Sequence, residues 1–95
     1  MKQISAEELR QNLQQNDQLF LVDVREDYEH ENFNIGGTLI PLGEIINRME
    51  DIPKDKPVIV YCRKGVRSQI AIQRLEQKGF TNLINLQGGL EAFKE

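Results

Sequence analysis

The residues whose types and spacing could do chemistry lie in one short basic segment. Cys62 is the only cysteine among the 95 residues. It is followed closely by a glycine and three cations, which are Arg63, Lys64, Gly65 and Arg67. No acidic residue lies between Tyr61 and Leu75. Because the thiolate is the reactive form of cysteine and nearby positive charge favours it, this segment predicts a nucleophilic sulfur in a site that attracts anions.

Gly65 would give the segment its shape. Glycine adopts positive φ angles easily, so the chain could curl here until successive backbone N–H groups point toward the sulfur. A helix that starts just after this curl would add the positive end of its dipole. The plainer interpretation is that Cys62 is a small buried apolar residue, as many free cysteines are. We prefer the reactive interpretation because a strand end, a glycine, three cations and a following helix coincide here.

An apolar run leads directly into Cys62. Residues 58–61 are Val, Ile, Val and Tyr, which is typical of a strand buried on both faces of a parallel sheet. Cys62 would then lie where this strand ends. In open α/β sheets, ligands bind outside the carboxyl ends of the strands, so a functional thiol is expected at such a position.

The rest of the chain alternates helices with strands. Ser5 and Glu8 have the spacing of a capping box, which predicts a helix over residues 6–15. Acidic residues from Glu26 onward indicate the first turn of a short helix. Apolar spacing predicts further helices over residues 42–49, 68–78 and 90–93, with Gly79 at the C′ position of the second of these.

Strands are expected at residues 19–22, 38–40, 58–61 and 83–86, with a short edge strand at Ile4. Turns are expected at residues 16–17, 53–57 and 88–89. This alternation predicts an α/β fold with a mainly parallel sheet of four to five strands and helices on both faces.

The composition bounds the class of protein. With 39% hydrophobic and 28% charged residues, the chain is expected to fold as one soluble domain over residues 1–95. Its net charge of −3 argues against a nucleic-acid-binding surface. The sequence shows no signal peptide and no apolar run long enough to cross a bilayer, so we expect a cytoplasmic monomer that binds neither nucleic acid nor membrane.

The single thiol limits the mechanism. One cysteine can form neither an internal disulfide nor a multi-thiolate zinc site, and we expect no metal and no cofactor. Transfer or redox chemistry must therefore use an external thiol or another acceptor. His30 lies in an acidic stretch, and we expect it to be solvated and without a functional role.

Several motifs, taken together and in order, resemble the rhodanese family of sulfurtransferases over nearly the whole chain. They are Leu21-Val22-Asp23-Val24-Arg25, Asn34-Ile35-Gly36-Gly37 with Ile40-Pro41-Leu42, the segment from Val60 to Ser68, Lys78-Gly79-Phe80, and the segment from Leu86 to Phe93. The resemblance implies a single-domain, rhodanese-like fold. Two departures concern substrate preference and packing more than chemistry. The family often has His-Ile-Pro-Gly at residues 34–37, and often a Trp in place of Phe93.

The same resemblance implies how the site would work. Cys62 would attack the outer sulfur of thiosulfate or a similar small anionic donor, become a persulfide, and pass the sulfur to cyanide or to a thiol, which could belong to a protein. The residues expected to bind the substrate are Arg63, Lys64, Gly65, Val66, Arg67 and Ser68. The loop amides would hold the persulfide, the cations would attract the donor, and the Ser68 hydroxyl would donate to the sulfur or the loop backbone. Asp23 and Arg25 match a family motif that we interpret as structural.

Two alternatives stay open at this point. A cysteine phosphatase also needs a thiolate in an anion-binding cup, but phosphatases of the related fold resemble one another in placing an arginine six positions after the cysteine. Here that position is Ser68 and the arginine is one earlier, at Arg67, so the loop is one residue too short to clamp a phosphate ester. The other alternative is a rhodanese-like module that carries sulfur or binds a partner without turnover.

Overall fold

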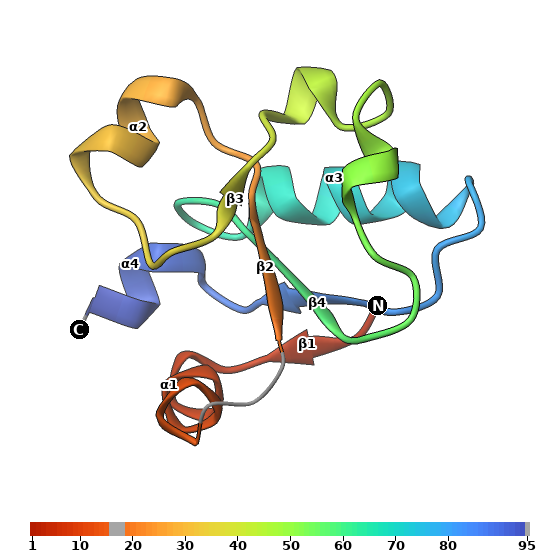
Figure 1. The fold of residues 1–95 in the computed structure, drawn as a ribbon. Coiled ribbons are helices and arrows are strands. Elements are labelled where there is room, and N and C mark those ends of the chain that lie inside the picture. Colours follow the sequence, from red (N-terminus) through yellow and green to blue (C-terminus); the bar gives the residue numbers. More distant parts are fainter. Residues whose placement is uncertain (16–18, 95) are drawn as a thin grey trace.

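A parallel sheet of five strands forms the centre of the molecule. The computed structural model describes residues 1–15 and 19–94. Its strands are β1 (Gln3–Ile4), β2 (Phe20–Asp23), β3 (Thr38–Leu39), β4 (Val58–Tyr61) and β5 (Leu83–Leu86), in the spatial order β1-β5-β4-β2-β3 (Figure 1). All neighbouring pairs are parallel. The predicted α/β fold with a mainly parallel sheet is confirmed.

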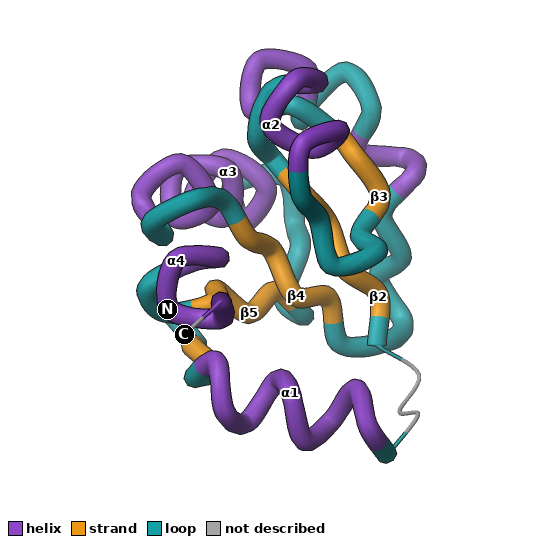
Figure 2. The backbone as a smooth tube through the Cα atoms, turned by 90° about the vertical axis from the view of Figure 1, so that its left-hand side faces the viewer, coloured by secondary structure: helices purple, strands orange, loops and turns teal. Residues whose placement is uncertain are grey.

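Helices cover both faces of this sheet (Figure 2). One face packs against α3 (Val66–Glu76), whose buried residues are Ser68, Ala71, Ile72 and Leu75. The other face packs against α1 (Ala6–Gln14) and α4 (Gly89–Lys94), which also contact each other. A shorter helix, α2 (Asp27–Asn32), follows β2. Among the described residues, no helix is long and apolar enough to cross a membrane.

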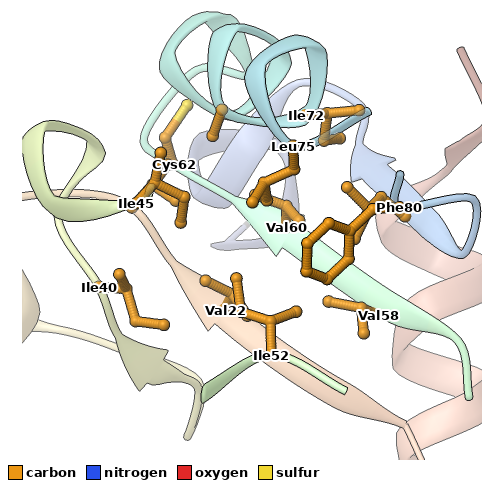
Figure 3. Packing of buried hydrophobic residues seen from close by; sticks show 13 residues of the cluster. Val22, Ile40, Ile45, Ile52, Val58, Val60, Cys62, Ile72, Leu75 and Phe80 are labelled. Carbon is orange, nitrogen blue, oxygen red and sulfur yellow. The ribbon is translucent and has the colours of Figure 1, made fainter. Parts of the chain in front are cut away.

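Strand β4 is central, and its side chains divide between two hydrophobic clusters. Val58, Val60 and Cys62 belong to the cluster under α3, whereas Ile59 and Tyr61 belong to the cluster under α1 and α4. This is the period of two that a strand imposes on its side chains. Figure 3 shows Cys62 among the side chains of the first cluster. Burial of each fully enclosed aliphatic side chain contributes about 1.5–3 kcal/mol, so the strand that leads to Cys62 is firmly held.

The first helix agrees with its sequence signals. The Ser5 hydroxyl accepts from the Glu8 backbone N–H, and the Glu8 carboxylate accepts from the Ser5 N–H, both at 3.1 Å. Leu9 is fully buried, and the helix ends at Gln14, with Gln15 as its cap. The turn predicted at residues 16–17 lies outside the described residues.

The helix predicted over residues 42–49 is wrong. Two 3₁₀ turns stand there instead, at Leu42–Glu44 and Met49–Asp51. The Ile45 N–H donates to the Leu42 carbonyl at 3.2 Å, which closes a turn of three residues rather than four. An apolar spacing of three suits both kinds of helix, and the tighter turns bury Ile45 in the cluster under α3.

The predicted bounds of α3 also need correction. The helix begins at Val66, two residues earlier than expected, because Gly65 in the left-handed region already serves as its N-cap. It ends at Glu76 with Gln77 as its cap, so Gly79 does not occupy the C′ position. Gly79 still has a positive φ of 96°, which lets the Phe80 N–H reach the Leu75 carbonyl at 3.2 Å.

Candidate functional site

Cys62 lies directly after β4, at the carboxyl edge of the sheet. Its side chain belongs to the core cluster, and the residue is only 1% exposed. The loop after it opens to solvent as a shallow depression of about 200 Å³, lined by Cys62, Arg63, Lys64, Val66 and Arg67. The position predicted for a functional thiol is therefore the one observed, at the end of a buried strand.

Two backbone N–H groups face the sulfur. The Gly65 N–H donates to Cys62 Sγ at 3.1 Å, and the Ser68 N–H, in the first turn of α3, faces it at 3.4 Å. Gly65 has φ +98°, a conformation that side chains other than glycine rarely adopt. The curl predicted at this glycine is thus present. Fixed N–H groups around a sulfur can stabilise negative charge on it.

The carbonyls of the loop point toward α4. The Leu90 N–H donates to the Cys62 carbonyl at 2.9 Å, and the Glu91 N–H donates to the Arg63 carbonyl at 3.0 Å. Gly89 lies so close to this backbone that a Cβ there would stand 2.6 Å from the Cys62 carbonyl oxygen. The sequence predicted a turn at this glycine but not its contact with the loop. The paired glycines were the available signal.

Ser68 differs from its predicted role. Its hydroxyl donates to Asn85 Oδ1 at 2.5 Å and lies 3.4 Å from Cys62 Sγ, which is placed to donate to it. The Asn85 amide donates in turn to Gln3 Oε1 at 3.2 Å. Ser68 and Asn85 are fully buried, so this chain of polar groups satisfies them inside the core. The group of Ser68 that donates toward the sulfur is its backbone N–H, because the hydroxyl proton goes to Asn85.

Arg67 is held by a residue that the sequence did not single out. Its Nη1 and Nη2 donate to Glu29 Oε1 and Oε2 at 2.7 and 2.9 Å, a bidentate pair between α3 and α2. The bond from Arg67 holds the pKa of Glu29 at about 2, well below its usual range. Pairing with Glu29 also raises the pKa of Arg67. Both groups therefore stay charged near neutral pH.

The other two cations of the loop are more exposed. Arg63 Nε donates to Glu91 Oε2 at 2.9 Å, but the two side chains are 63% and 46% exposed, so solvent screens this pair. Lys64 is exposed, and within residues 1–15 and 19–94 it forms no ion pair. Beside Arg63, between α2 and α4, lies a larger hollow of about 520 Å³.

Asp23 and Arg25 form a buried pair at the end of β2. Arg25 Nε and Nη2 donate to the two Asp23 carboxylate oxygens at 2.9 and 2.8 Å, and Arg25 also donates to the Phe33 carbonyl. Burial is the largest single effect on the pKa of Arg25 and acts to lower it, but the hydrogen bond to Asp23 and the nearby negative charges, mainly that of Asp23, together raise it. The pair ties β2 to the segment after α2, in agreement with the structural interpretation.

The expectation that His30 is solvated is wrong. Its Nδ1 lies 2.8 Å from Asp23 Oδ2, and its side chain is only 22% exposed. The acidic stretch forms α2, which turns this side chain inward toward β2. Among the described residues, no group of three or more His, Cys, Asp or Glu side chains is arranged to hold a metal ion.

The two departures from the family pattern lie outside residues 62–68, which we call the thiol loop. Asn34 stabilises its own turn: its amide donates to the His30 carbonyl at 2.9 Å, and its Oδ1 accepts from the Gly36 N–H at 2.8 Å. Phe93, at the position of the frequent Trp, packs in the cluster under α1 and α4 and lies under the Arg10 guanidinium, 4.8 Å from it. Both positions therefore have local packing roles.

Known proteins resemble this chain along most of its length. A family model described as the rhodanese-like domain matches residues 5–95. A protein named sulfurtransferase from Allochromatium vinosum is 38% identical over 94 residues, covering 98% of this chain and 88% of that protein. A protein named thiosulfate sulfurtransferase GlpE from Coxiella burnetii is 34% identical over 94 residues, covering 98% and 87% of the two chains.

A solved structure has the same fold. The rhodanese-like domain protein from Staphylococcus aureus superposes with a TM-score of 0.91 at 32% identity, covering 98% of this chain and 91% of that one. The fold, the family match and the similarity to relatives of comparable length agree with one another. They show that the chain belongs to the rhodanese-like domain family.

Proposed function

We propose that this protein is a sulfurtransferase that uses Cys62 as its nucleophile. The family and the names of the relatives support a general sulfurtransferase role. The observation that carries the proposal is the surrounding of the Cys62 sulfur, which two backbone N–H groups of its loop face at 3.1 and 3.4 Å. Such donors favour the negative charge that a thiolate and an ionised persulfide carry on sulfur.

In the first half-reaction, the Cys62 thiolate attacks the outer sulfur of thiosulfate or a similar small anionic donor. A new S–S bond forms as the S–S bond of thiosulfate breaks, and sulfite leaves with the electron pair of that bond. Lys64 and Arg63 line the mouth of the depression and attract the donor. The Gly65 and Ser68 N–H groups hold the persulfide that results.

In the second half-reaction, cyanide or a thiolate attacks the outer sulfur of the persulfide. The S–S bond breaks, Cys62 leaves as a thiolate, and thiocyanate or a new persulfide is released. Because Cys62 is the only cysteine, an acceptor thiol must come from another molecule. The hollow between α2 and α4 gives such an acceptor an approach beside the loop. The cytoplasm, which keeps free thiols reduced, suits this exchange.

A phosphatase has less support. Ser68 occupies the position at which phosphatases of the related fold resemble one another by having an arginine. Its buried hydroxyl donates to Asn85 instead of facing an anion. Arg67, one position earlier, is engaged by Glu29. The planar fork that clamps a phosphate ester is therefore not available in this loop.

Steady-state assays separate these functions. With thiosulfate and cyanide, the wild-type protein should form thiocyanate over many turnovers, and Cys62→Ser should lower the rate by at least about 1000-fold because the nucleophile is lost. A circular dichroism melt should show that the variant is folded. Hydrolysis of an aryl phosphate that depends on Cys62 would instead favour a phosphatase. A folded, reduced protein that takes up one sulfur but never turns over would favour the carrier module.

A further inference from the structure

Helix α2 places a carboxylate at the rim of the thiol loop. Glu29 and Arg67 are 38 positions apart in the sequence. Each oxygen of the Glu29 carboxylate nevertheless accepts a hydrogen bond from one terminal nitrogen of the Arg67 guanidinium, at 2.7 and 2.9 Å. Their side chains are 16% and 33% exposed, so solvent screens this pair less than a pair on the open surface. Arg67 lines the depression at Cys62. Because Glu29 is paired with Arg67, its negative charge contributes to the electrostatic potential at this depression.

The position of Glu29 is fixed independently of Arg67. Its Oε1 also accepts from the Glu26 backbone N–H at 3.0 Å, which is one half of the capping box of α2. The carboxylate is thus held in place by its own helix, and the arginine reaches across to it. A bidentate bond of this kind fixes the plane of the guanidinium as well as its distance.

The other acidic residue at the rim is bound differently. Glu91 meets Arg63 through a single bond at 2.9 Å, and both side chains are largely exposed. Thermal motion and salt break such a pair easily, so Arg63 can turn toward an anion. Arg67 can turn toward an anion only if its guanidinium leaves the Glu29 carboxylate, which is bonded to both of its terminal nitrogens. Of the three cations that follow Cys62, Arg67 alone has its charge cancelled in a fixed geometry.

We propose that Glu29 is a positioning residue that holds the Arg67 guanidinium and cancels its charge, and that it thereby sets how strongly Cys62 discriminates between anionic and neutral reactants. Applied to sulfur donors, this inference rests on the proposed sulfurtransferase function. Glu29 restrains the attraction of the site for doubly charged donors such as thiosulfate, and it leaves Lys64 and Arg63 as the cations that draw a reactant in.

The test compares alkylation of Cys62 by iodoacetate, an anion, with alkylation by neutral iodoacetamide at low ionic strength. The measured quantity is the rate constant for iodoacetate divided by that for iodoacetamide. In Glu29→Gln this ratio should rise about fivefold, because the charge of Arg67 is no longer cancelled. Glutamine can still accept from the Glu26 N–H, so α2 should keep its capping box. The matched control is Glu91→Gln, which changes the net charge equally and should alter the ratio by less than about twofold.

A second variant protects the test against simple misfolding. Arg67→Gln leaves the Glu29 charge uncompensated, so the ratio should fall by a similar factor, and the double variant should return close to the wild-type ratio. Added salt should shrink all these differences. An unchanged ratio in both single variants, or equal changes in Glu29→Gln and Glu91→Gln, would overturn the proposal.

This readout needs no sulfur transfer, so it is separate from the proposed function. A wild-type protein that forms no persulfide would contradict the sulfurtransferase proposal. The alkylation ratio would still test the role of Glu29. If transfer occurs, Glu29→Gln should also lower the KM for thiosulfate by about the same factor, with a smaller change in kcat, because the restored charge acts on binding of the anion.

Discussion

The ends of β2 and β4 lie side by side, and each carries a buried polar side chain that is stabilised in a different way. Asp23 and Tyr61 are paired in register, so the Asp23 carboxylate and the Cys62 sulfur stand at the same edge of the sheet. The carboxylate is surrounded by side chains, since Arg25 and His30 both bond to it. The sulfur is faced mainly by backbone N–H groups.

This difference separates a structural group from a reactive one. The charge of Asp23 is already balanced by Arg25, and both of its oxygens accept hydrogen bonds. Asp23 therefore ties β2 to the segment after α2 and has no free oxygen with which to bind a substrate. The donors around Cys62 belong to the peptide backbone and carry no counter-charge of their own. These N–H groups can stabilise negative charge that forms on the sulfur without moving, because they already point at it. A covalent intermediate on the sulfur requires such fixed donors.

The largest effect on stability is expected at the end of β2. Asp23→Ala leaves the buried Arg25 without its partner and should lower the free energy of unfolding by about 3–5 kcal/mol. Urea denaturation followed by circular dichroism measures this loss. Glu91→Ala, which breaks an exposed pair, serves as the control and should cost less than about 1 kcal/mol. If the two variants were equally stable, the carboxylate of Asp23 would not be the structural group described here.

The end of β4 should be most sensitive at Gly89. In Gly89→Ala, a Cβ would press on the backbone of Cys62 and Arg63, and φ +63° adds strain. We expect a loss of about 1–3 kcal/mol in stability. We also expect a fall of about 100-fold in sulfur transfer, because the loop N–H groups would shift from the sulfur.

Gly43→Ala is the matched control for this variant. Its Cβ would meet no atom within 4 Å and its φ is not positive, so stability should change by less than about 0.5 kcal/mol. Equal activity in the two variants would show that α4 does not hold the loop in its working shape.

The smallest of these effects is the dependence of stability on pH through Glu29. Its pKa is about 2 in the folded protein, below its ordinary value of 4.5, so the ion pair with Arg67 stabilises the fold above pH 4.5. This contribution should be lost as the pH falls from 4.5 toward 2. Glu29→Gln should therefore be less stable than the wild type by about 1 kcal/mol at pH 7, and the difference should vanish only as the pH falls below 2. A difference that grows in acid would contradict the assignment.

The parts of the fold that depend on neighbouring residues could be predicted from the sequence. The capping box at Ser5, the buried run that ends at Cys62 and the glycine that curls the loop act over short distances, and each left a clear pattern. The 3₁₀ turns were mistaken for one helix because an apolar spacing of three fits both.

The contacts that complete the site could not be predicted in the same way. Glu29 meets Arg67, Asn85 meets Ser68, and Gly89 meets the Cys62 carbonyl only after the sheet and helices have packed. No local pattern marks the first two pairs, since each partner is an ordinary residue in its own segment, and the paired glycines at residues 88–89 indicate a turn without naming what it contacts. His30 was misjudged for the same reason, because its partner Asp23 lies on another element.

The most direct test of the central claim is the mass of the intact protein after incubation with thiosulfate. A folded, reduced sample should gain the mass of one sulfur atom, located on Cys62 by peptide mapping, and cyanide should remove it with release of one equivalent of thiocyanate. Cys62→Ser should gain nothing. A wild-type protein that gains no sulfur and releases no thiocyanate would contradict the claim that this loop holds a persulfide.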